Sequence, residues 1–332
     1  MHDVLKNRCE KAIEDRVFPG CVIGVASRGR EPQYLALGGY TYDTRSPRVQ
    51  ENTIYDLASI TKSIPTASLV SIFVEANAIS LDAAVKEYIP EIQNDYSATV
   101  EDLLRYRVRG ARMSTIQSRT FEQVRAYVLE NGFDGPAGEY SYSNAPAFLL
   151  GMIVERVSGS ILPALAQKHF FGPLGMEDTT FFPHDIARVA PTEIVQGEEI
   201  RGIVHDESAR IFSRVRRSVG HAGVFSTAPD LIKFLHAVLD STASYGSIAR
   251  DAEEGLGWQV AEEYFMGSRH SAKTFGKTGF TGTSVCIDRS RGVALVILSN
   301  RTYPQRPPDA TSQDCTINVF RRDVSEIVFS AL

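Results

Sequence analysis

Apolar residues near both ends of the chain recur at spacings that predict helices and strands. Residues 4–17 carry apolar side chains at helical spacing, at Val4, Leu5, Cys9, Ala12, Ile13 and Val17. Apolar, β-prone runs follow over 21–27 and 33–39, and two more lie near the other end over 283–287 and 292–299. Short turn-forming segments separate the members of each pair, so each pair predicts an antiparallel hairpin. A final helix is expected over 316–331.

The middle of the chain has a different pattern. Segments separated by Gly- and Pro-rich loops favour helix over 63–76, 100–106, 120–130, 145–157 and 161–170. This distribution predicts an α/β fold of the α+β type, with an antiparallel sheet built from both termini and flanked by helices. We expect residues 1–58 and 215–332 to form the sheet domain and residues 59–214 a mainly helical inserted domain. The active site is expected in the cleft between them.

The composition is that of a folded globular protein that binds a small molecule. The chain has 332 residues, 43% hydrophobic and 23% charged, and a formal net charge of -5. This balance gives no reason to expect nucleic-acid or anionic-membrane binding. No apolar run approaches the roughly 20 residues that span a bilayer. The first residues do not resemble a secretory signal, so we expect a cytoplasmic protein. The oligomeric state stays open.

The four cysteines are scattered along the chain, at Cys9, Cys21, Cys286 and Cys315. No C-x-x-C pair and no His-Glu-x-x-His occurs, which argues against a zinc or redox site. We therefore expect reduced, packed thiols and no bound metal.

Ser59-Ile60-Thr61-Lys62 is the one Ser-x-x-Lys in the chain, and it lies at the start of a predicted helix. Residues three apart share a helix face, so the Lys62 amine can reach the Ser59 hydroxyl and remove its proton. This requires that burial or a neighbouring cation keep the amine neutral. Taken alone the motif is weak, because a serine N-cap followed by an exposed lysine has the same pattern.

Two further motifs strengthen this interpretation. Tyr142 and Asn144 lie on a turn before a helical run, where a phenol can relay protons and an amide can hold a lysine amine and a substrate carbonyl. Lys277-Thr278-Gly279-Phe280 enters a predicted strand and brings a cation, a hydroxyl and an open backbone to one side of a cleft. Each motif alone also fits ordinary packing or a hairpin turn. The three in this order indicate a serine hydrolase.

With these motifs, the sequence resembles the serine β-lactamase and penicillin-binding-protein superfamily, in particular class C β-lactamases and family VIII carboxylesterases. The resemblance covers nearly the whole chain and includes segments 56–62, 171–180, 204–207, 220–227 and 255–258. It implies a β-lactamase/transpeptidase-like fold with no cofactor.

The resemblance also implies a role for each motif residue. Ser59 is expected to be the nucleophile, Lys62 its base, and Tyr142 the relay that also activates the deacylating water. Asn144 would orient Lys62 and the substrate. Lys277 would favour a phenolate-like Tyr142 and anionic substrates, and its charge would also lower the pKa of Lys62. The N–H groups of Ser59 and Phe280 would form the oxyanion hole, with Thr278 and Gly279 beside the substrate.

Three segments depart from the family pattern. Residues 105–110 replace the usual His-Thr-Ser-Gly loop, so the conformation of that loop stays open. Pro65 should weaken or kink the first turns of the helix after Ser59. Residues 300–306 match only loosely the segment where class C enzymes meet the substrate carboxylate.

Other readings are a Ser-His-Asp hydrolase, a ligand-binding sensor without catalysis, and an acyltransferase. No serine has glycines at both offsets of the Gly-x-Ser-x-Gly elbow, which disfavours the first, and His205 and His221 are expected to be structural. The sensor is disfavoured because the motif residues are all present. The acyltransferase stays open, because an acyl-serine can pass its acyl group to water or to an alcohol. Among substrates we expect small carboxylic esters to be cleaved faster than β-lactams; a β-lactamase, a D-Ala-D-Ala carboxypeptidase and a D-aminopeptidase are alternatives.

Overall fold

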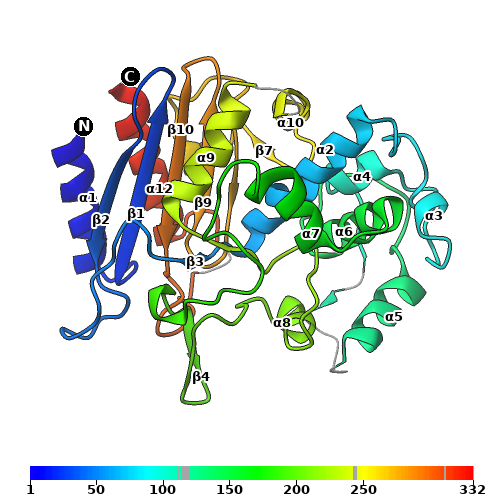
Figure 1. Cartoon of the computed structure of the whole chain (residues 1–332), viewed down its shortest axis with the longest axis horizontal. Coiled ribbons are helices and arrows are strands. Elements are labelled where there is room, and N and C mark those ends of the chain that lie inside the picture. Colours follow the sequence, from blue (N-terminus) through cyan, green and yellow to red (C-terminus); the bar gives the residue numbers. More distant parts are fainter. Residues whose placement is uncertain (111, 114–119, 242–244, 310–311, 332) are drawn as a thin grey trace.

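A six-stranded antiparallel sheet, in the order β2-β1-β10-β9-β8-β7, occupies the left half of the computed structural model as Figure 1 shows it. The structure describes residues 1–110, 112–113, 120–241, 245–309 and 312–331. The strands are β1 (Gly20–Ser27), β2 (Gln33–Gly38), β7 (Gln259–Val260), β8 (Phe275–Thr278), β9 (Ser284–Asp288) and β10 (Val293–Ser299). Strands β1 and β10 pair in register from Cys21 opposite Ser299 to Ser27 opposite Val293. The predicted sheet built from both termini is confirmed, and β7 and β8 extend it beyond the two hairpins expected.

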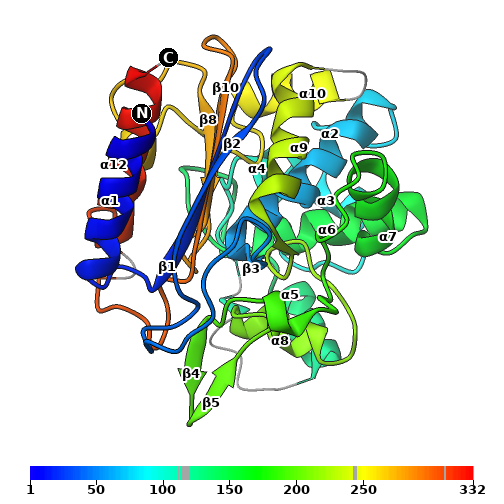
Figure 2. The same ribbon diagram turned by 60° about the vertical axis from the view of Figure 1, so that its left-hand side comes forward.

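The sheet is covered by helices on both faces (Figure 2). Helices α1 (His2–Glu14) and α12 (Thr316–Ser330) cover one face, and α9 (Ala228–Leu239) and α10 (Tyr245–Glu253) lie on the other side. Side chains alternate along β1, because successive residues of a strand point to opposite faces. Ile23 packs in the apolar cluster under α1 and α12, while Val22 packs in the larger cluster that includes α9.

The segment between the two halves of the sheet is mainly helical, as the sequence pattern predicts. It contains α2 (Ser68–Glu75), α3 (Val85–Tyr88), α4 (Val100–Leu104), α5 (Phe121–Asn131), α6 (Ala145–Ser158), α7 (Leu162–Ala166) and α8 (Glu207–Ser213). Two small sheets pair β3 (Tyr55–Asp56) with β6 (Phe225–Ser226) and β4 (Glu193–Val195) with β5 (Glu198–Ile200), and α11 (Glu263–Met266) precedes β8. The domain boundaries at residues 58 and 214 stay a prediction.

The helix expected over 63–76 differs from the one observed. Ser59 lies in a 3-10 helix, Ala58–Lys62, and α2 begins only at Ser68, after a π-helical turn over Ser63–Ala67. Ile64 has non-helical φ and ψ angles of -118° and 105°. The cause is Pro65, because a proline ring disfavours the helical conformation of the residue before it.

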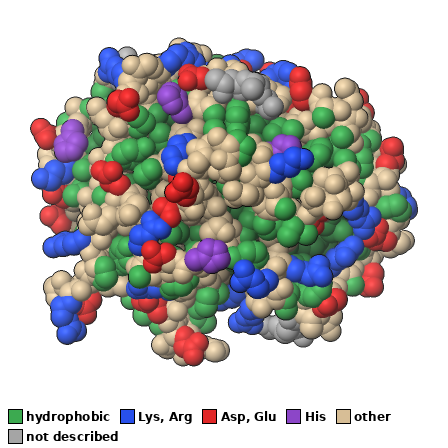
Figure 3. Space-filling model, viewed as in Figure 1, with side chains coloured by type: hydrophobic (Ala, Val, Ile, Leu, Met, Phe, Trp, Pro, Cys, Tyr) green, Lys and Arg blue, Asp and Glu red, His purple; other side chains and the backbone are tan. Residues whose placement is uncertain are grey.

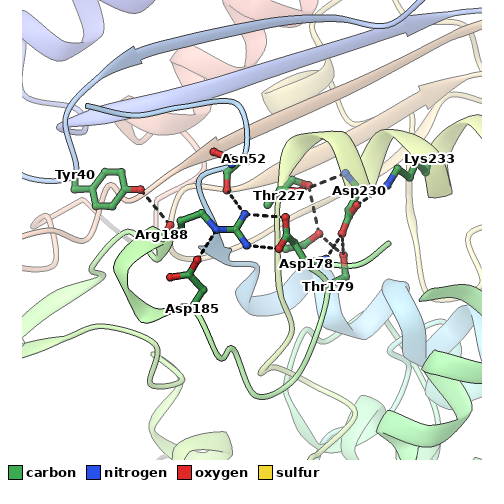
Figure 4. Close-up of polar contacts among 10 residues, drawn as sticks. Tyr40, Asn52, Asp178, Thr179, Asp185, Arg188, Thr227, Asp230 and Lys233 are labelled. Carbon is green, nitrogen blue, oxygen red and sulfur yellow. Dashed lines mark hydrogen bonds and ion pairs between the residues drawn. The ribbon is translucent and has the colours of Figure 1, made fainter. Parts of the chain in front are cut away.

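A polar network holds the segment that precedes Ser59 (Figure 4). Arg188 donates hydrogen bonds to Asp178, to Asp185 and to the carbonyl of Asn52. The amide of Asp178 donates to Asp230 on α9. The backbone of residue 188 in turn accepts from the Ile54 N–H at 2.9 Å. The network therefore fixes the chain just before β3, which leads directly to Ser59.

In the part of the chain that the structure describes, no single helix is both long and apolar enough to cross a membrane; the bent pair Ala145–Ser158 and Leu162–Phe171 passes together, by length and composition only. On the face seen in Figure 3, basic and acidic side chains are interspersed.

Candidate active site

Ser59 follows β3 at a strained point of the backbone. Ala58 has a φ of 47°, which a residue with a Cβ rarely adopts. The buried carboxylate of Asp56 accepts hydrogen bonds from the Ala58 N–H at 2.8 Å and the His205 N–H at 2.7 Å. These bonds hold the turn on which Ser59 stands. Surrounding structure of this kind is what allows a strained residue to persist beside a functional group.

Lys62 is in direct contact with the Ser59 hydroxyl. Its Nζ lies 2.9 Å from Ser59 Oγ and donates to the carbonyl of His221, also at 2.9 Å. The side chain is buried, at 1% exposed. Burial lowers the pKa of Lys62 to about 8, although the charge of Asp206 opposes this change. A substantial fraction of Lys62 is therefore neutral near neutral pH and can accept the serine proton.

Tyr142 reaches the same point from the turn before α6. It is 48% exposed as a residue, yet its hydroxyl end lies in the cleft and is hydrogen-bonded to the Ser59 side chain. Burial raises the pKa of Tyr142 to about 12, against the lowering effect of that hydrogen bond. This direction favours the neutral phenol in the resting site, and the expected phenolate-like Tyr142 stays a prediction.

Asn144 is held by an anion rather than by Lys62. Its Nδ2 donates to Asp206 Oδ2 at 3.0 Å. A carboxylate only accepts hydrogen bonds, so this contact fixes which side of the amide faces Asp206. Burial opposes ionisation of Asp206, but hydrogen bonds with His221, Ser208 and the Ala209 N–H lower its pKa well below the usual value. The site thus contains a partly buried negative charge beside Asn144.

Lys277 enters the site from β8, opposite Val285 of β9. It is 1% exposed, and its Nζ lies 5.3 Å from the centre of the Tyr142 ring. Burial lowers the pKa of Lys277 to about 7, with a further lowering from the charge of Lys62 and an opposing effect of Glu262. The ammonium groups of Lys62 and Lys277 repel each other, and this repulsion disfavours the charged form of both. That Lys277 lowers the pKa of Lys62 stays a prediction.

The loop after Lys277 packs directly against the chain that leads to Ser59. Thr281 and Thr283 donate from their hydroxyls to the carbonyls of Asp56 and Leu57. A Cβ on Gly279 would meet the Leu57 carbonyl oxygen at 2.4 Å, so only glycine fits there. The Thr278 hydroxyl is hydrogen-bonded to Tyr264.

Two backbone amides are available for an oxyanion. Ser59 is the second residue of its 3-10 helix, so its N–H has no partner within that helix. Among the described residues, the Phe280 N–H has no acceptor. Both residues line the same cleft, as the oxyanion-hole expectation requires.

The cleft has a volume of about 540 Å³ and a basic far end. Arg321 of α12 donates to the carbonyls of Gly279 and Thr283 at 2.8 and 2.7 Å, and Arg301 donates to the Phe280 carbonyl at 2.8 Å. Burial and the nearby Arg301 charge lower the pKa of Arg321, and its Nε is buried without a partner within the described chain. The Phe280 ring lies between the guanidiniums of Arg301 and Arg306 and the ring of His205.

Sequence comparison identifies the group to which this chain is related. A sequence model of the family described as Beta-lactamase matches residues 5–315. The chain belongs to the β-lactamase family. A protein of Escherichia coli (strain K12) named "Putative D-alanyl-D-alanine carboxypeptidase" is 28% identical over 319 residues, covering 77% of this chain and 72% of that protein.

Two solved structures share the fold of this β-lactamase-family chain. A class C beta lactamase from Rhodobacter sphaeroides has a TM-score of 0.76 at 19% identity, covering 99% of each chain. The hydrolase EstCE1, described as having promiscuous acyltransferase activity, has a TM-score of 0.73 at 19% identity and covers 96% of this chain and 97% of its own. The resemblance to the serine β-lactamase and penicillin-binding-protein superfamily is confirmed.

In this member of the β-lactamase family, the structure brings together the predicted residues Ser59, Lys62, Tyr142 and Lys277. Sequence reasoning missed Asp206 and Arg321. Asp206 is part of segment 204–207, which resembles the family. That resemblance indicated a segment near the site, but it did not indicate that the Asp206 carboxylate acts on Lys62 and Asn144. Arg321 lies within a helix whose pattern indicated only packing. In the described ranges, no group of three or more His, Cys, Asp or Glu side chains is arranged to hold a metal ion.

Proposed function

We propose that this chain hydrolyses small carboxylic esters through an acyl-Ser59 intermediate. The observation that carries the proposal is the 2.9 Å contact between Lys62 Nζ and Ser59 Oγ, together with a pKa of Lys62 near 8. A buried amine that is partly neutral near neutral pH can take the serine proton as Oγ attacks the ester carbonyl.

The remaining steps use the neighbouring groups. The carbonyl oxygen becomes an oxyanion, which the N–H groups of Ser59 and Phe280 stabilise. The neutral phenol of Tyr142 donates its proton to the departing alkoxide and regains one from the protonated Lys62. In the second half, water attacks the acyl carbonyl, its proton passes to the Lys62–Tyr142 pair, and Ser59 recovers its hydroxyl proton as the acid leaves.

Esters are the favoured substrates because an alkoxide or phenoxide leaves more readily than an amide nitrogen. A general acyl-serine site therefore cleaves them with less specialised assistance. We also propose that the protein is cytoplasmic and that it binds neither nucleic acid nor a membrane.

A second candidate function is a carboxypeptidase acting on peptides that end in D-Ala-D-Ala. The guanidiniums of Arg301 and Arg321 that line the cleft favour it, because arginines pair well with a terminal carboxylate, whereas Arg306 is already ion-paired with Glu193 and Glu207. The printed name of the E. coli relative also supports it.

One comparison of rates separates these candidates. The value of kcat/KM is measured at one pH for an aryl butyrate, a chromogenic cephalosporin and a D-Ala-D-Ala peptide. The proposal expects the ester to have the highest value; a higher value for the cephalosporin or the peptide would replace the esterase by a β-lactamase or a carboxypeptidase.

Two further measurements address the other readings. Product analysis with an added alcohol distinguishes hydrolysis from acyl transfer. Intact-mass measurement after treatment with a fluorophosphonate, an aryl ester and a penicillin shows whether Ser59 forms an acyl-enzyme; a protein that forms none with any of them would be a binding protein rather than an enzyme.

A further inference from the structure

Lys277 is a buried cation that lies among aromatic rings. Its Nζ lies 4.7 Å from the centre of the Tyr106 ring and 5.3 Å from that of Tyr142. No hydrogen bond or ion pair of its amine is formed within the described residues. A buried ammonium without hydrogen bonds is costly, and the negative face of an aromatic ring compensates part of that cost.

Tyr106 occupies a backbone position that normally requires glycine. Helix α4 ends at Leu104, and the N–H groups of Tyr106 and Arg107 donate back to the carbonyls of Leu103 and Asp102. This is the Schellman arrangement, whose left-handed residue is most often glycine. Here that residue is Tyr106, with a φ of 53°. A left-handed backbone is unfavourable for a residue with a Cβ, although Arg16, Asn77 and Arg216 occupy the same kind of helix end in this chain.

The backbone of Tyr106 also ties this loop to the turn that carries Tyr142. The Tyr106 carbonyl accepts the Ser141 N–H at 2.7 Å, and the rings of Tyr106 and Tyr142 lie 5.4 Å apart at an angle of 35°. The Tyr106 ring is buried, at 4% exposed. It is therefore a fixed surface beside both the Tyr142 ring and the Lys277 amine.

We infer that Tyr106 is a positioning residue, whose ring face holds the Lys277 ammonium beside Tyr142 and favours its charged form. Only the catalytic consequence of this inference rests on the proposed acyl-Ser59 hydrolase, because the contact between Tyr106 and Lys277 is present without substrate. This role accounts for the aromatic residue at the left-handed position of the loop over 105–110, which departs from the family pattern.

Other charges around Lys277 bear on its protonation. Lys62 disfavours the charged form and Glu262 favours it, and both act in addition to burial. Further charged side chains line a cavity of about 370 Å³ that reaches Lys277, namely Arg105, Arg107, Glu253 and Glu254. A substitution at position 106 leaves all of these charges in place. A change in the pKa of Lys277 caused by that substitution therefore measures the effect of the Tyr106 ring.

The test is a direct titration of Lys277, which does not depend on activity. The protein is labelled with 13Cε-lysine, and the Lys277 resonance is assigned by its loss in Lys277→Met. In Tyr106→Leu the apolar volume stays but the ring face is gone, so the pKa of Lys277 should fall by about one unit. In Tyr106→Phe it should stay within a few tenths of a unit of the wild type, because the ring face is kept.

Tyr140 provides a matched control. Its ring is 6.0 Å from that of Tyr106 and 59% of the residue is exposed. Tyr140→Leu should leave the Lys277 titration unchanged. If Tyr106→Leu does not fold, fluorinated phenylalanines at position 106 keep the ring shape while weakening its negative face, and the pKa of Lys277 should then fall as fluorines are added. The inference would be overturned if Lys277 had the same pKa as in the wild type in Tyr106→Leu or throughout the fluorinated series.

A kinetic measurement then tests the catalytic consequence. For esters that carry a carboxylate, kcat/KM relative to matched neutral esters should fall several-fold in Tyr106→Leu and not in Tyr106→Phe. An equal loss on both ester types would assign Tyr106 a structural role only. A wild type that cleaves no ester would contradict the proposed function, while the titration would still decide the role of Tyr106.

Discussion

The Lys62→Met substitution removes the proposed base while keeping an unbranched side chain. At a pKa of 10.5, a lysine is neutral in roughly 0.03% of molecules at pH 7, whereas a pKa of about 8 makes roughly 9% neutral. Burial therefore increases the reactive population roughly 300-fold at that pH. The amine that Lys62→Met removes is 2.9 Å from Ser59 Oγ, and the remaining neighbour, the phenol of Tyr142, is the weaker candidate for the base because burial raises its pKa.

We expect kcat/KM of Lys62→Met for an aryl ester to fall by at least about 1,000-fold, because general-base assistance and its coupling to the nucleophile are lost together. The wild-type kcat/KM should rise with pH along a limb with an apparent pKa near 8. At pH 6 the wild type should retain roughly 1% of its plateau value. This limb should be absent in the variant.

The assay is hydrolysis of an aryl butyrate from pH 5.5 to 10 at constant ionic strength, corrected for spontaneous hydrolysis. Lys86→Met is the control, because Lys86 is an exposed lysine of α3. It should leave both the rate and the limb unchanged. A Lys62→Met enzyme within about tenfold of the wild type, or a wild-type profile that is flat between pH 6 and 9, would refute the assignment of Lys62 as the base.

Three further results are expected. Ser59→Ala should abolish turnover and fluorophosphonate labelling while the melting temperature stays the same, and a labelled Ser59→Ala protein would contradict the nucleophile assignment. Asp206→Asn keeps a helix-capping side chain but removes the charge that raises the pKa of Lys62, so the acidic limb should move to lower pH in the same assay; an unmoved limb would exclude this electrostatic role. Lys277→Met should raise the melting temperature at pH 6, because a pKa lowered from 10.5 to about 7 in the folded state costs stability below pH 10.5, and the full cost is present below pH 7. The gain should fade as the pH rises toward 10.5, and a gain independent of pH would show that lost charge is not its cause.

The sheet and the order of the helices could be predicted because they follow from local patterns. Residues 21–27 and 292–299 are apolar runs bounded by turn signals, and they pair as β1 and β10. Strand β7 has only two residues, Gln259–Val260. Two residues are too few to show the alternation of apolar and polar side chains that indicates a strand, so β7 was not predicted. The start of α2 was misplaced because an apolar pattern continues through Ile64 and Pro65, although the backbone does not.

The motif residues could be found because each motif is local, whereas the groups that act on them come from distant parts of the chain. Asp206 lies 144 positions after Lys62, and Arg321 lies 44 positions after Lys277. Neither carries a local signal, since an aspartate before a helix reads as a cap and an arginine on an amphipathic helix reads as surface. Tyr106 was hidden for the same reason, because a left-handed tyrosine cannot be distinguished in sequence from an ordinary packed one.

The order of proton transfers depends on burial, which no motif specifies. The resemblance names Lys62 as the base and Tyr142 as the proton relay, but it gives no physical reason for that order. In the structure the two pKa values lie about four units apart, near 8 for Lys62 and near 12 for Tyr142. Burial causes both shifts, because it disfavours the charged form of each group: the ammonium of Lys62 and the phenolate of Tyr142. In the proposed mechanism one environment therefore favours the lysine as the base and the tyrosine as the acid, with the first proton passing to Lys62 and the leaving group taking its proton from Tyr142.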